Sequence, residues 1–269
     1  PRADCPGEKE KVQAVRDYVL ARIDWPCRLQ ALFRDENLGC DRAITEAIDW
    51  FFQQEERGII LEDDCLPALS FFRFCRELLQ KYKNDSRIQH IAGYTFMDYG
   101  RAQPRYSYDF VGLPNCWGWA TWRRAWEQYA RDMSGLAEFI ASRKIDKIFQ
   151  RTLPKLHFLH IFKKMRDPRK RITWDYRWAY TIMQNDGICL TPTRNMITNI
   201  GFGREATHTV QKSRSINYKS YETVFPLKHP LRIRLNRKLA DALDTDIKRP
   251  FLALRNALLN KIKRGIKIK

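Results

Sequence analysis

The chain has 269 residues, of which 44% are hydrophobic and 30% are charged, with twelve glycines and twelve prolines. This length and composition indicate one large folded domain, or a domain with an appendage, and exclude disordered and collagen-like chains. The formal net charge of +18 favours a polyanionic partner, which is nucleic acid, an anionic membrane surface or a phosphate-bearing substrate.

Hydrophobic spacing predicts the first elements of the fold. Residues 8–23 and 37–52 carry apolar side chains at helical spacing, and residues 27–33 between them are expected to form a short strand. The apolar run at 58–61 stops abruptly at three acids, which is typical of a buried, parallel strand that delivers side chains to its carboxyl end.

The following segments continue this alternation. Residues 70–78 predict a helix rich in phenylalanine, and residues 88–92 predict a short strand. A further helix is expected through Trp178 and Ile182. Alternating helices and strands predict an α/β layered fold with a mainly parallel central sheet.

The seven cysteines show neither a CxxC pair nor zinc-finger spacing. Because an odd number cannot all pair within one chain, we expect reduced thiols and a cytoplasmic protein. No stretch approaches the roughly 18 apolar residues that a spanning helix needs, so we expect neither a membrane span nor an export signal.

The composition changes at residue 227. From there to the end, 13 Lys and Arg stand against three Asp, which gives +10 of the total +18. We therefore expect one domain over 1–226 and a basic, helical C-terminal extension over 227–269. Residues 250–269 mix apolar and basic side chains, as in an amphipathic helix on the inner face of the plasma membrane. A solvated helix packed on the domain explains them equally well.

Glu62, Asp63 and Asp64 follow the apolar run directly. Adjacent like charges are unfavourable unless a cation or hydrogen-bond donors compensate them. Mg²⁺ and Mn²⁺ prefer carboxylate oxygens, and open α/β sheets place ligands at the carboxyl ends of strands. The acids are therefore candidate metal ligands, and the alternative is a solvated turn in which Asp64 caps the next helix. The segment Asp244-Thr245-Asp246 also has the D-x-D form, but no apolar strand precedes it.

Several ordered motifs resemble those of a known enzyme class. GIILEDDCLPALSFFRF at 58–74 resembles the metal-binding segment of GT-A glycosyltransferases, in particular the Golgi N-acetylglucosaminyltransferase I family, whose motif is likewise Glu-Asp-Asp. WDYRW at 174–178 sits where that family has a Trp-Asp-Asp-Trp segment with its catalytic base, and residues 192–208 resemble the loop over the nucleotide sugar. Bacterial nucleotide-diphospho-sugar transferase-like proteins are more similar still, through the blocks NLG, EDDC, WGWATWRRAW, NIGFG, ATHT and FPLKHP.

The resemblance implies a GT-A fold whose first strand and helix lie before Pro1, so that part of the nucleotide-base pocket is missing from this chain. It also implies an inverting hexosyl- or N-acetylhexosaminyltransferase that uses Mn²⁺ or Mg²⁺. The donor would be a nucleotide sugar, most simply a UDP-sugar. The acceptor would be a glycan or a lipid-linked sugar of bacterial cell-envelope polysaccharide synthesis, and no nucleic-acid partner is expected.

The resemblance also assigns roles to single residues. Asp64, together with Asp63, would hold the metal, while Glu62 and Asp63 would reach the ribose, the sugar hydroxyls or metal-bound waters. Asp175 would be the catalytic base, and the alternative is that it caps its own helix. Tyr176 stands where the family has a second acid, so a shift of one position would place the base among the nearby acids.

Other candidate contacts have simpler structural explanations beside them. Asn37 and Gly39 either approach the donor or form a turn before a helix. Gly203 and His208 belong to a stretch that would close over the diphosphate, although a single histidine is more often structural. Trp119, like its neighbouring tryptophans, either offers a platform to a sugar ring or packs in the core.

Two other functions are compatible with the sequence. A nucleotidyltransferase uses a related α/β layer with an acidic metal site, but the sequence shows no Gly-rich loop with Lys or Arg to hold a triphosphate. A nucleic-acid-binding protein would use the positive charge and the many aromatic side chains. The charge, however, is concentrated in the tail, while the aromatic residues lie in the middle of the chain.

Overall fold

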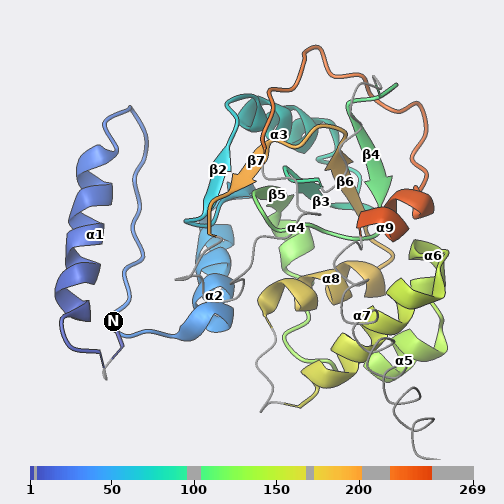
Figure 1. The fold of residues 1–269 in the computed structure, drawn as a ribbon, viewed down its shortest axis with the longest axis horizontal. Helices are drawn as coiled ribbons and strands as arrows, with labels where there is room; N and C mark the ends of the chain where they lie inside the picture. The colour runs from blue at the N-terminus through green and yellow to red at the C-terminus, as the bar shows by residue number, and fades with distance from the viewer. Residues whose placement is uncertain (3–4, 96–103, 168–172, 202–218, 244–269) are drawn as a thin grey trace, which may run out of the picture.

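A computed structural model describes residues 1–2, 5–95, 104–167, 173–201 and 219–243 of the chain (Figure 1). The fold is mixed α/β, with a five-stranded sheet and a separate two-stranded ribbon. The helices are α1 (Glu8–Arg22), α2 (Gly39–Gln54), α3 (Ser70–Lys81), α4 (Arg123–Trp126), α5 (Leu136–Ala141), α6 (Ile145–Ile148), α7 (Thr152–Met165), α8 (Trp174–Gln184) and α9 (Arg237–Leu243). The strands are β1 (Arg57–Ile60), β2 (Cys65–Pro67), β3 (Ile88–Ala92), β4 (Tyr108–Val111), β5 (Trp119–Trp122), β6 (Ile188–Pro192) and β7 (Ile197–Asn199).

The five-stranded sheet is mixed and has the order β1-β5-β3-β6-β4. Only β3 and β6 run parallel, whereas β1–β5, β5–β3 and β6–β4 are antiparallel. The prediction of a mainly parallel sheet is therefore wrong. The causes are β5, which inserts between β1 and β3 and runs opposite to both, and β4, which pairs antiparallel with β6. The insertion of β5 also leaves β1 as a half-buried strand at the edge of the described sheet.

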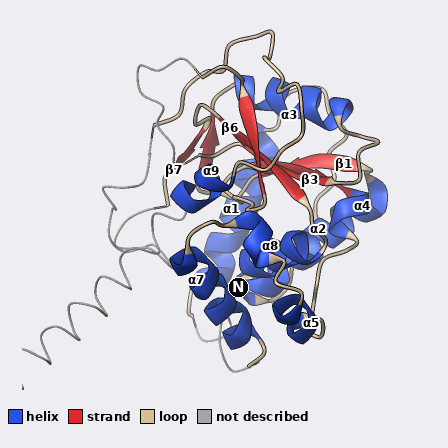
Figure 2. Ribbon diagram, turned by 90° about the vertical axis from the view of Figure 1, so that its right-hand side faces the viewer, coloured by secondary structure: helices blue, strands red, loops and turns tan. Residues whose placement is uncertain are grey.

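Helices cover both faces of the sheet (Figure 2). Alternate strand residues join core clusters on its two sides. Phe110 of β4 joins a core cluster with the apolar side chains of α3, such as Phe74. Its neighbour Val111 joins the opposite cluster with Trp178 of α8 and Ile48 of α2. This alternation follows from the two-residue period of a strand, so the fold has three layers with the sheet in the middle.

Residues beyond 226 pack into the same core. Leu227 is buried in the α3 cluster, and Leu239 of α9 is buried in the α8 cluster. Ala240 is buried against the helices α5 to α8. The composition shift at residue 227 thus marks a change in charge and not a change in packing. Residues 250–269, expected to form an amphipathic helix, lie outside the described residues.

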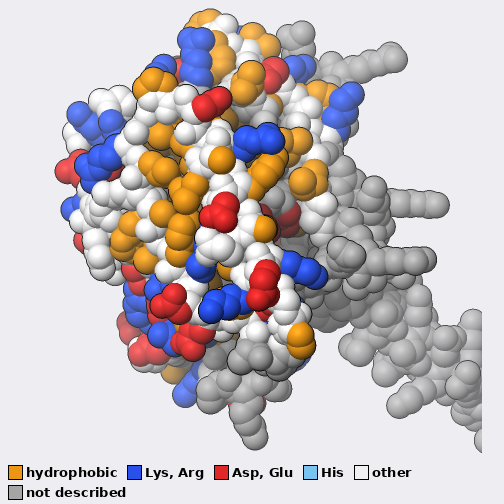
Figure 3. Space-filling view, turned by 90° about the vertical axis from the view of Figure 1, so that its left-hand side faces the viewer, with side chains coloured by type: hydrophobic (Ala, Val, Ile, Leu, Met, Phe, Trp, Pro, Cys, Tyr) orange, Lys and Arg blue, Asp and Glu red, His pale blue; other side chains and the backbone are white. Residues whose placement is uncertain are grey.

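The first 36 residues have few contacts with the sheet. Figure 1 shows α1 standing apart from the sheet, and none of its residues is buried. Residues 27–33 form no strand, so that prediction is wrong: an extended segment needs a neighbour, and the described residues give it none. Figure 3, which faces this side of the molecule, shows hydrophobic side chains gathered on the surface. Those exposed on α1 and the segment after it are Val15, Tyr18, Val19, Leu20, Trp25, Leu29 and Phe33.

All seven cysteines lie within the described residues and are free thiols, as the odd count led us to expect. Four of them are buried, namely Cys65, Cys75, Cys116 and Cys189. Burial raises the pKa of each of these four thiols, which keeps them protonated. Among the helices of the described residues, none is long and apolar enough to cross a membrane.

His90 of β3 is a fully buried polar residue in the centre of the sheet. The indole Nε1 of Trp178 donates a hydrogen bond to His90 Nδ1 at 3.1 Å, and His90 Nε2 lies 3.0 Å from the carbonyl oxygen of Asn115. This pattern fits a neutral ring with its proton on Nε2. Burial lowers the pKa of His90 from 6.5 to about 3.

We predict that His90 makes the protein less stable in mild acid. Below pH 6.5 the unfolded chain binds a proton at His90 and the folded chain does not, so stability present above that pH is lost as the pH falls. The cost between pH 7.5 and 5.5 is about 1.4 kcal/mol for this residue. In urea unfolding at the two pH values, His90→Gln should remove this part of the pH dependence. Ile91→Val, a core truncation without a titratable group, should leave this pH dependence in place. An equal change in the free energy of unfolding between the two pH values in all three proteins would contradict the role given to His90.

Candidate functional site

The three acids form the tight turn between β1 and β2. The amide of Cys65 donates to the carbonyl oxygen of Glu62 at 3.1 Å, which closes the turn. The amide of Ile200, just after β7, donates to the carbonyl oxygen of Asp64 at 2.8 Å. The Asp64 carboxylate lies against Gly201, where a Cβ atom would be only 2.3 Å from Asp64 Oδ2. A glycine is therefore required at 201 for Asp64 to hold this position.

Asp64 does not cap the next helix. The N-cap of α3 is Leu69, five residues beyond Asp64. The Glu222 carboxylate accepts hydrogen bonds from the amides of Leu69 and Ser70 at 3.1 and 2.8 Å and so serves the start of α3. The carboxylates of the β1–β2 turn remain available to other partners, and within the described residues none of the three forms an ion pair.

Asp175 lies in the first turn of α8, and its side chain is half-buried. The N-cap of this helix is Thr173, so Asp175 does not occupy the capping position. The hydroxyl of Thr173 donates a hydrogen bond to Asp175 Oδ1. A second contact also holds the start of α8: the Tyr129 hydroxyl donates a hydrogen bond to the carbonyl oxygen of Trp174 at 3.1 Å.

The β1–β2 turn and the start of α8 meet in space. Burial and then the negative charges of Asp64, Asp175 and Asp63, in that order, together raise the pKa of Glu62 from 4.5 to about 7. Cys40 of α2 is close to the same acids. Burial is the largest cause that raises the pKa of its thiol, and the negative charges of Glu62 and Asp175 come next. Four carboxylates from two segments distant in sequence thus act on one another at one edge of the sheet.

Trp119 lies in the core beneath this site. It is fully buried on β5, and it pairs with Ile60, the last residue of β1. Its ring stacks on His90 at 5.1 Å and on Trp174 at 5.8 Å between centroids. The predicted platform for a sugar ring is therefore a packed core residue, and Trp119 supports the acids from beneath without reaching the surface.

Gly118, the residue before Trp119, has a left-handed backbone with φ +62°. A Cβ atom there would lie 2.5 Å from Cδ1 of Ile197, so a side chain of β7 occupies the space against this glycine. The amide of Gly93 also donates to the Gly118 carbonyl oxygen at 2.8 Å. The glycine thus allows the ribbon to pack closely on the main sheet, beside the β1–β2 turn.

Asn37 and Gly39 form the turn that opens α2. The Gly39 amide donates to Asn37 Oδ1 at 2.8 Å, and Gly39 has φ +73°, a conformation that favours glycine. Both residues are exposed. The Arg177 guanidinium holds this turn against α8, with Nη1 at 2.7 and 2.6 Å from the two carboxylate oxygens of Asp41. The turn interpretation is confirmed, and the turn lies beside the start of the helix that carries Asp175.

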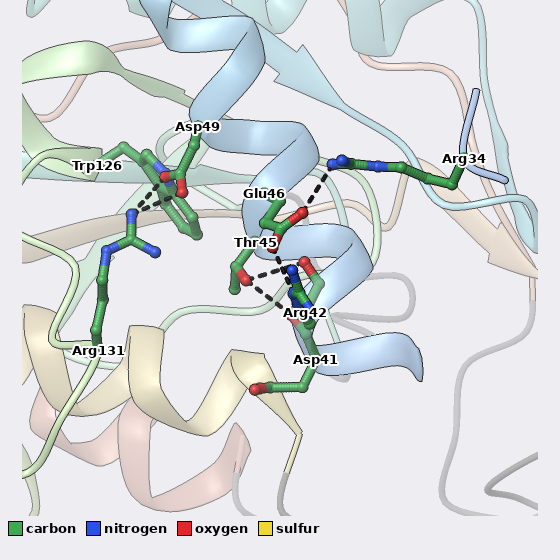
Figure 4. Close-up of polar contacts among 8 residues, drawn as sticks. All are labelled: Arg34, Asp41, Arg42, Thr45, Glu46, Asp49, Trp126 and Arg131. Atoms are coloured by element: carbon green, nitrogen blue, oxygen red, sulfur yellow. Dashed lines mark hydrogen bonds and ion pairs between the residues drawn. The ribbon is translucent and has the colours of Figure 1, made fainter. Parts of the chain in front are cut away.

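The middle of α2 is anchored by a second set of polar contacts (Figure 4). Asp49 accepts a hydrogen bond from Trp126 Nε1 at 2.8 Å and forms an ion pair with Arg131 at 2.7 Å. On another side of the helix, Glu46 pairs with Arg34 at 3.1 Å. These contacts fix α2 to the chain before it and to α4 and the segment that follows, so the position of the Asn37–Gly39 turn is well determined.

Other predicted site residues cannot be placed. Gly203 and His208, and the D-x-D segment at 244–246, lie outside the described residues. Sequence reasoning also missed residues that the structure brings to the site. Asp41 and Arg177 are opposite charges far apart in the sequence, and only the fold pairs them. Cys40 precedes Asp41 without any pattern of its own.

The described His, Cys, Asp and Glu side chains include no group of three or more arranged to hold a metal ion. Magnesium bound together with a phosphorylated substrate commonly takes only one or two carboxylates, with phosphate oxygens and waters as the other ligands. Asp64 and Asp63 are oxygen donors without a competing cation, which fits a site of that kind. A closed cage made by protein side chains alone does not fit these residues.

No protein-family model matches the chain, and no curated protein matches it.

We predict that Glu62 destabilises the fold above neutral pH. Its folded pKa of about 7 exceeds the reference value of 4.5, so stability falls as the pH rises through this window, and the penalty is complete above it. Glu62→Gln should raise the free energy of unfolding by about 2–3 kcal/mol at pH 8 and by less than about 1 kcal/mol at pH 5. Glu56→Gln, an exposed substitution just before β1, serves as the control. Equal stabilities of wild type and Glu62→Gln at pH 8 would contradict the convergence of the acids.

Proposed function

We propose that the chain is a metal-dependent glycosyltransferase of the GT-A type. It moves a sugar from a nucleoside-diphosphate donor to a hydroxyl of a glycan or a lipid-linked acceptor, with inversion at the anomeric carbon. The observation that carries this proposal is the convergence of the acids after β1 with Asp175 at the start of α8. The α/β fold with its mixed sheet is compatible with it.

We call the group formed by Glu62, Asp63, Asp64 and Asp175 the acidic edge. It can bind a diphosphate only through a cation, because the carboxylates and the phosphates repel each other. Asp64 and Asp63 are the residues that would hold Mn²⁺ or Mg²⁺ there. When bound, such an ion neutralises the charge that develops on the leaving diphosphate. Asp64 suits this role because the ribbon β2–β7 fixes its backbone and Gly201 fixes the place of its carboxylate.

Asp175 is the proposed base. The acceptor oxygen forms a bond to the anomeric carbon while the bond from that carbon to the diphosphate oxygen breaks, and the nucleoside diphosphate leaves with the electron pair. The acceptor proton passes to a carboxylate oxygen of Asp175. Thr173 donates to Oδ1 of Asp175 and so orients the carboxylate.

Glu62 has a different role in this proposal. With a pKa of about 7, it carries its proton in a substantial fraction of molecules at neutral pH. A protonated carboxyl group is a hydrogen-bond donor as well as an acceptor. Glu62 can therefore hydrogen-bond a ribose or sugar hydroxyl of the donor in either protonation state: when protonated it can donate, and when ionised, as a bound cation favours, it accepts.

The surrounding motifs support the same assignment. The Asn37–Gly39 turn lies beside α8 and offers exposed backbone to a donor, since Gly39 has no side chain to block a close approach. The resemblance to nucleotide-sugar transferases covers NLG, EDDC, WGWATWRRAW and WDYRW. Residues of all four blocks surround or support the acidic edge, and this is the arrangement that a shared site requires.

We predict metal-dependent nucleotide binding at Asp64. In calorimetry, a UDP or other nucleoside diphosphate should bind in the presence of Mn²⁺ and not in its absence. Asp64→Asn should weaken this binding at least about tenfold, because one metal ligand loses its charge. Asp246→Asn, in the D-x-D segment at 244–246, is the matched control and should bind as the wild type does. If Asp246→Asn alone abolished binding, the site would lie in the tail and not at β1.

We predict that a divalent cation activates Cys40. Burial and then the acidic neighbours raise the pKa of this thiol, so a cation bound among those acids lowers the pKa and increases the thiolate fraction. Millimolar Mg²⁺ should raise the iodoacetamide reaction rate of Cys40 about threefold at pH 8. Cys27, which is also exposed, provides an internal control in the same peptide map. An unchanged Cys40 rate, or an equal change at Cys27, would argue against a cation at the acids.

A further inference from the structure

Residues 219–229 tie α3 to the ribbon β2–β7, and we call this segment the strap. At the ribbon, the hydroxyl of Thr198 donates a hydrogen bond to Ser220 Oγ at 2.9 Å. At the start of α3, the amide of Thr223 donates to Ser70 Oγ at 2.8 Å. The strap therefore supports the ribbon, whose other end fixes the backbone of the acids after β1.

A chain of four side chains holds the end of the strap. The hydroxyl oxygens of Tyr82 and Tyr108 lie 2.6 Å apart, and the Tyr108 hydroxyl lies 2.9 Å from His229 Nδ1. On its other side, His229 Nε2 lies 3.3 Å from a carboxylate oxygen of Glu77. Both tyrosines are buried, whereas His229 and Glu77 are in partial contact with water. The chain thus runs from the core, beside β4, to the surface of α3.

Only one direction of donation satisfies every member of this chain. The ionised Glu77 carboxylate can only accept, so His229 donates from Nε2 and accepts at Nδ1. Tyr108 then donates to His229 and accepts from Tyr82. A proton added at Nδ1 reverses these bonds, and the Tyr82 hydroxyl loses its acceptor, because Tyr108 is its only hydrogen-bond partner among the described residues. A buried donor without an acceptor is costly, so the chain disfavours a charged imidazole.

The groups that face His229 have opposite effects on its charge. Glu77 of α3 favours the imidazolium, and Lys81, one turn further along the same helix, disfavours it. Burial, followed by Lys81, outweighs Glu77, so the pKa of His229 lies below its usual value of 6.5. From the other side, Tyr108 and Tyr82 remain neutral, because burial raises the pKa of both phenols.

We propose that the strap is a pH-sensitive element that neutral His229 holds on α3 and that acid releases. Above pH 6.5, His229 completes the hydrogen-bond chain. Below that pH, the released strap binds a proton at His229 in water more readily than the held strap does, so acid favours local opening of the strap. The ribbon beside Asp64 then loses one of its supports, while the core of the fold stays closed.

The test is hydrogen–deuterium exchange of the full chain, without nucleotide, at pH 7.5 and 5.5. Each exchange rate is divided by the intrinsic rate at that pH. Three amides of the strap donate hydrogen bonds and report its opening: those of Tyr221, Thr223 and Lys228. Their relative exchange should rise about two- to tenfold in acid, because only the released strap takes up the proton fully.

Four variants assign this rise to His229. His229→Gln keeps a donor and an acceptor without titrating, so its strap should exchange equally at both pH values. Lys81→Gln removes the cation that opposes the imidazolium and should reduce the rise, whereas Lys83→Gln, an exposed neighbour, should not. His90→Gln removes an acid-sensitive group of the core and should leave the rise in place.

Four outcomes would overturn the proposal. They are a rise below twofold in wild type, an undiminished rise in His229→Gln or in Lys81→Gln, and loss of the rise in His90→Gln, which would mean that the whole fold opens. Unchanged circular dichroism at pH 7.5 confirms that each variant folds, and Lys81→Gln alters only an exposed side chain. Because no nucleotide is used, the result does not depend on the proposed transferase function.

Discussion

The packing of Trp119 against Trp174 is the contact on which the candidate site depends. Trp119 pairs with the last residue of β1, and Trp174 immediately precedes Asp175. Stacking of the two rings therefore ties the strand that ends in the acids to the helix that carries the fourth carboxylate. Burial of these large rings contributes several kcal/mol of apolar stabilisation, and the fold holds like charges together at the surface above them.

This arrangement has a cost that the core offsets. Glu62 is held where burial and three other acids disfavour its charge, and none of the acids after β1 has a cationic partner among the described residues. A strongly perturbed carboxyl group such as that of Glu62, set among other acids at one edge of a sheet, is typical of functional sites, where the charge of a ligand completes the balance. A cation that also binds a diphosphate would provide that balance here.

The sequence predicted the elements that depend on local patterns. The helices at α1, α2 and α3 and the strands β1 and β3 follow from hydrophobic spacing, and the abrupt stop at Glu62 located the acidic turn. Pairing between strands could not be predicted, because Val, Ile and Trp satisfy parallel and antiparallel neighbours alike; the insertion of β5 beside β1 is decided by the whole chain. The roles of Trp119 and Gly118 also depend on what packs against them. Asp41 and Arg177 form a pair only through the approach of α2 to α8.

The central claim is that Asp175 acts on a substrate held by the acids after β1. Its most direct test is the release of nucleoside diphosphate from a panel of nucleotide sugars with Mn²⁺ and simple sugar or lipid-linked acceptors. We expect Asp175→Asn to bind nucleotide as wild type does and to release product at least about 100-fold more slowly, because only the proton acceptor is lost. Equal rates in wild type and Asp175→Asn, with nucleotide bound by both, would contradict the assignment of the base and the site built around it.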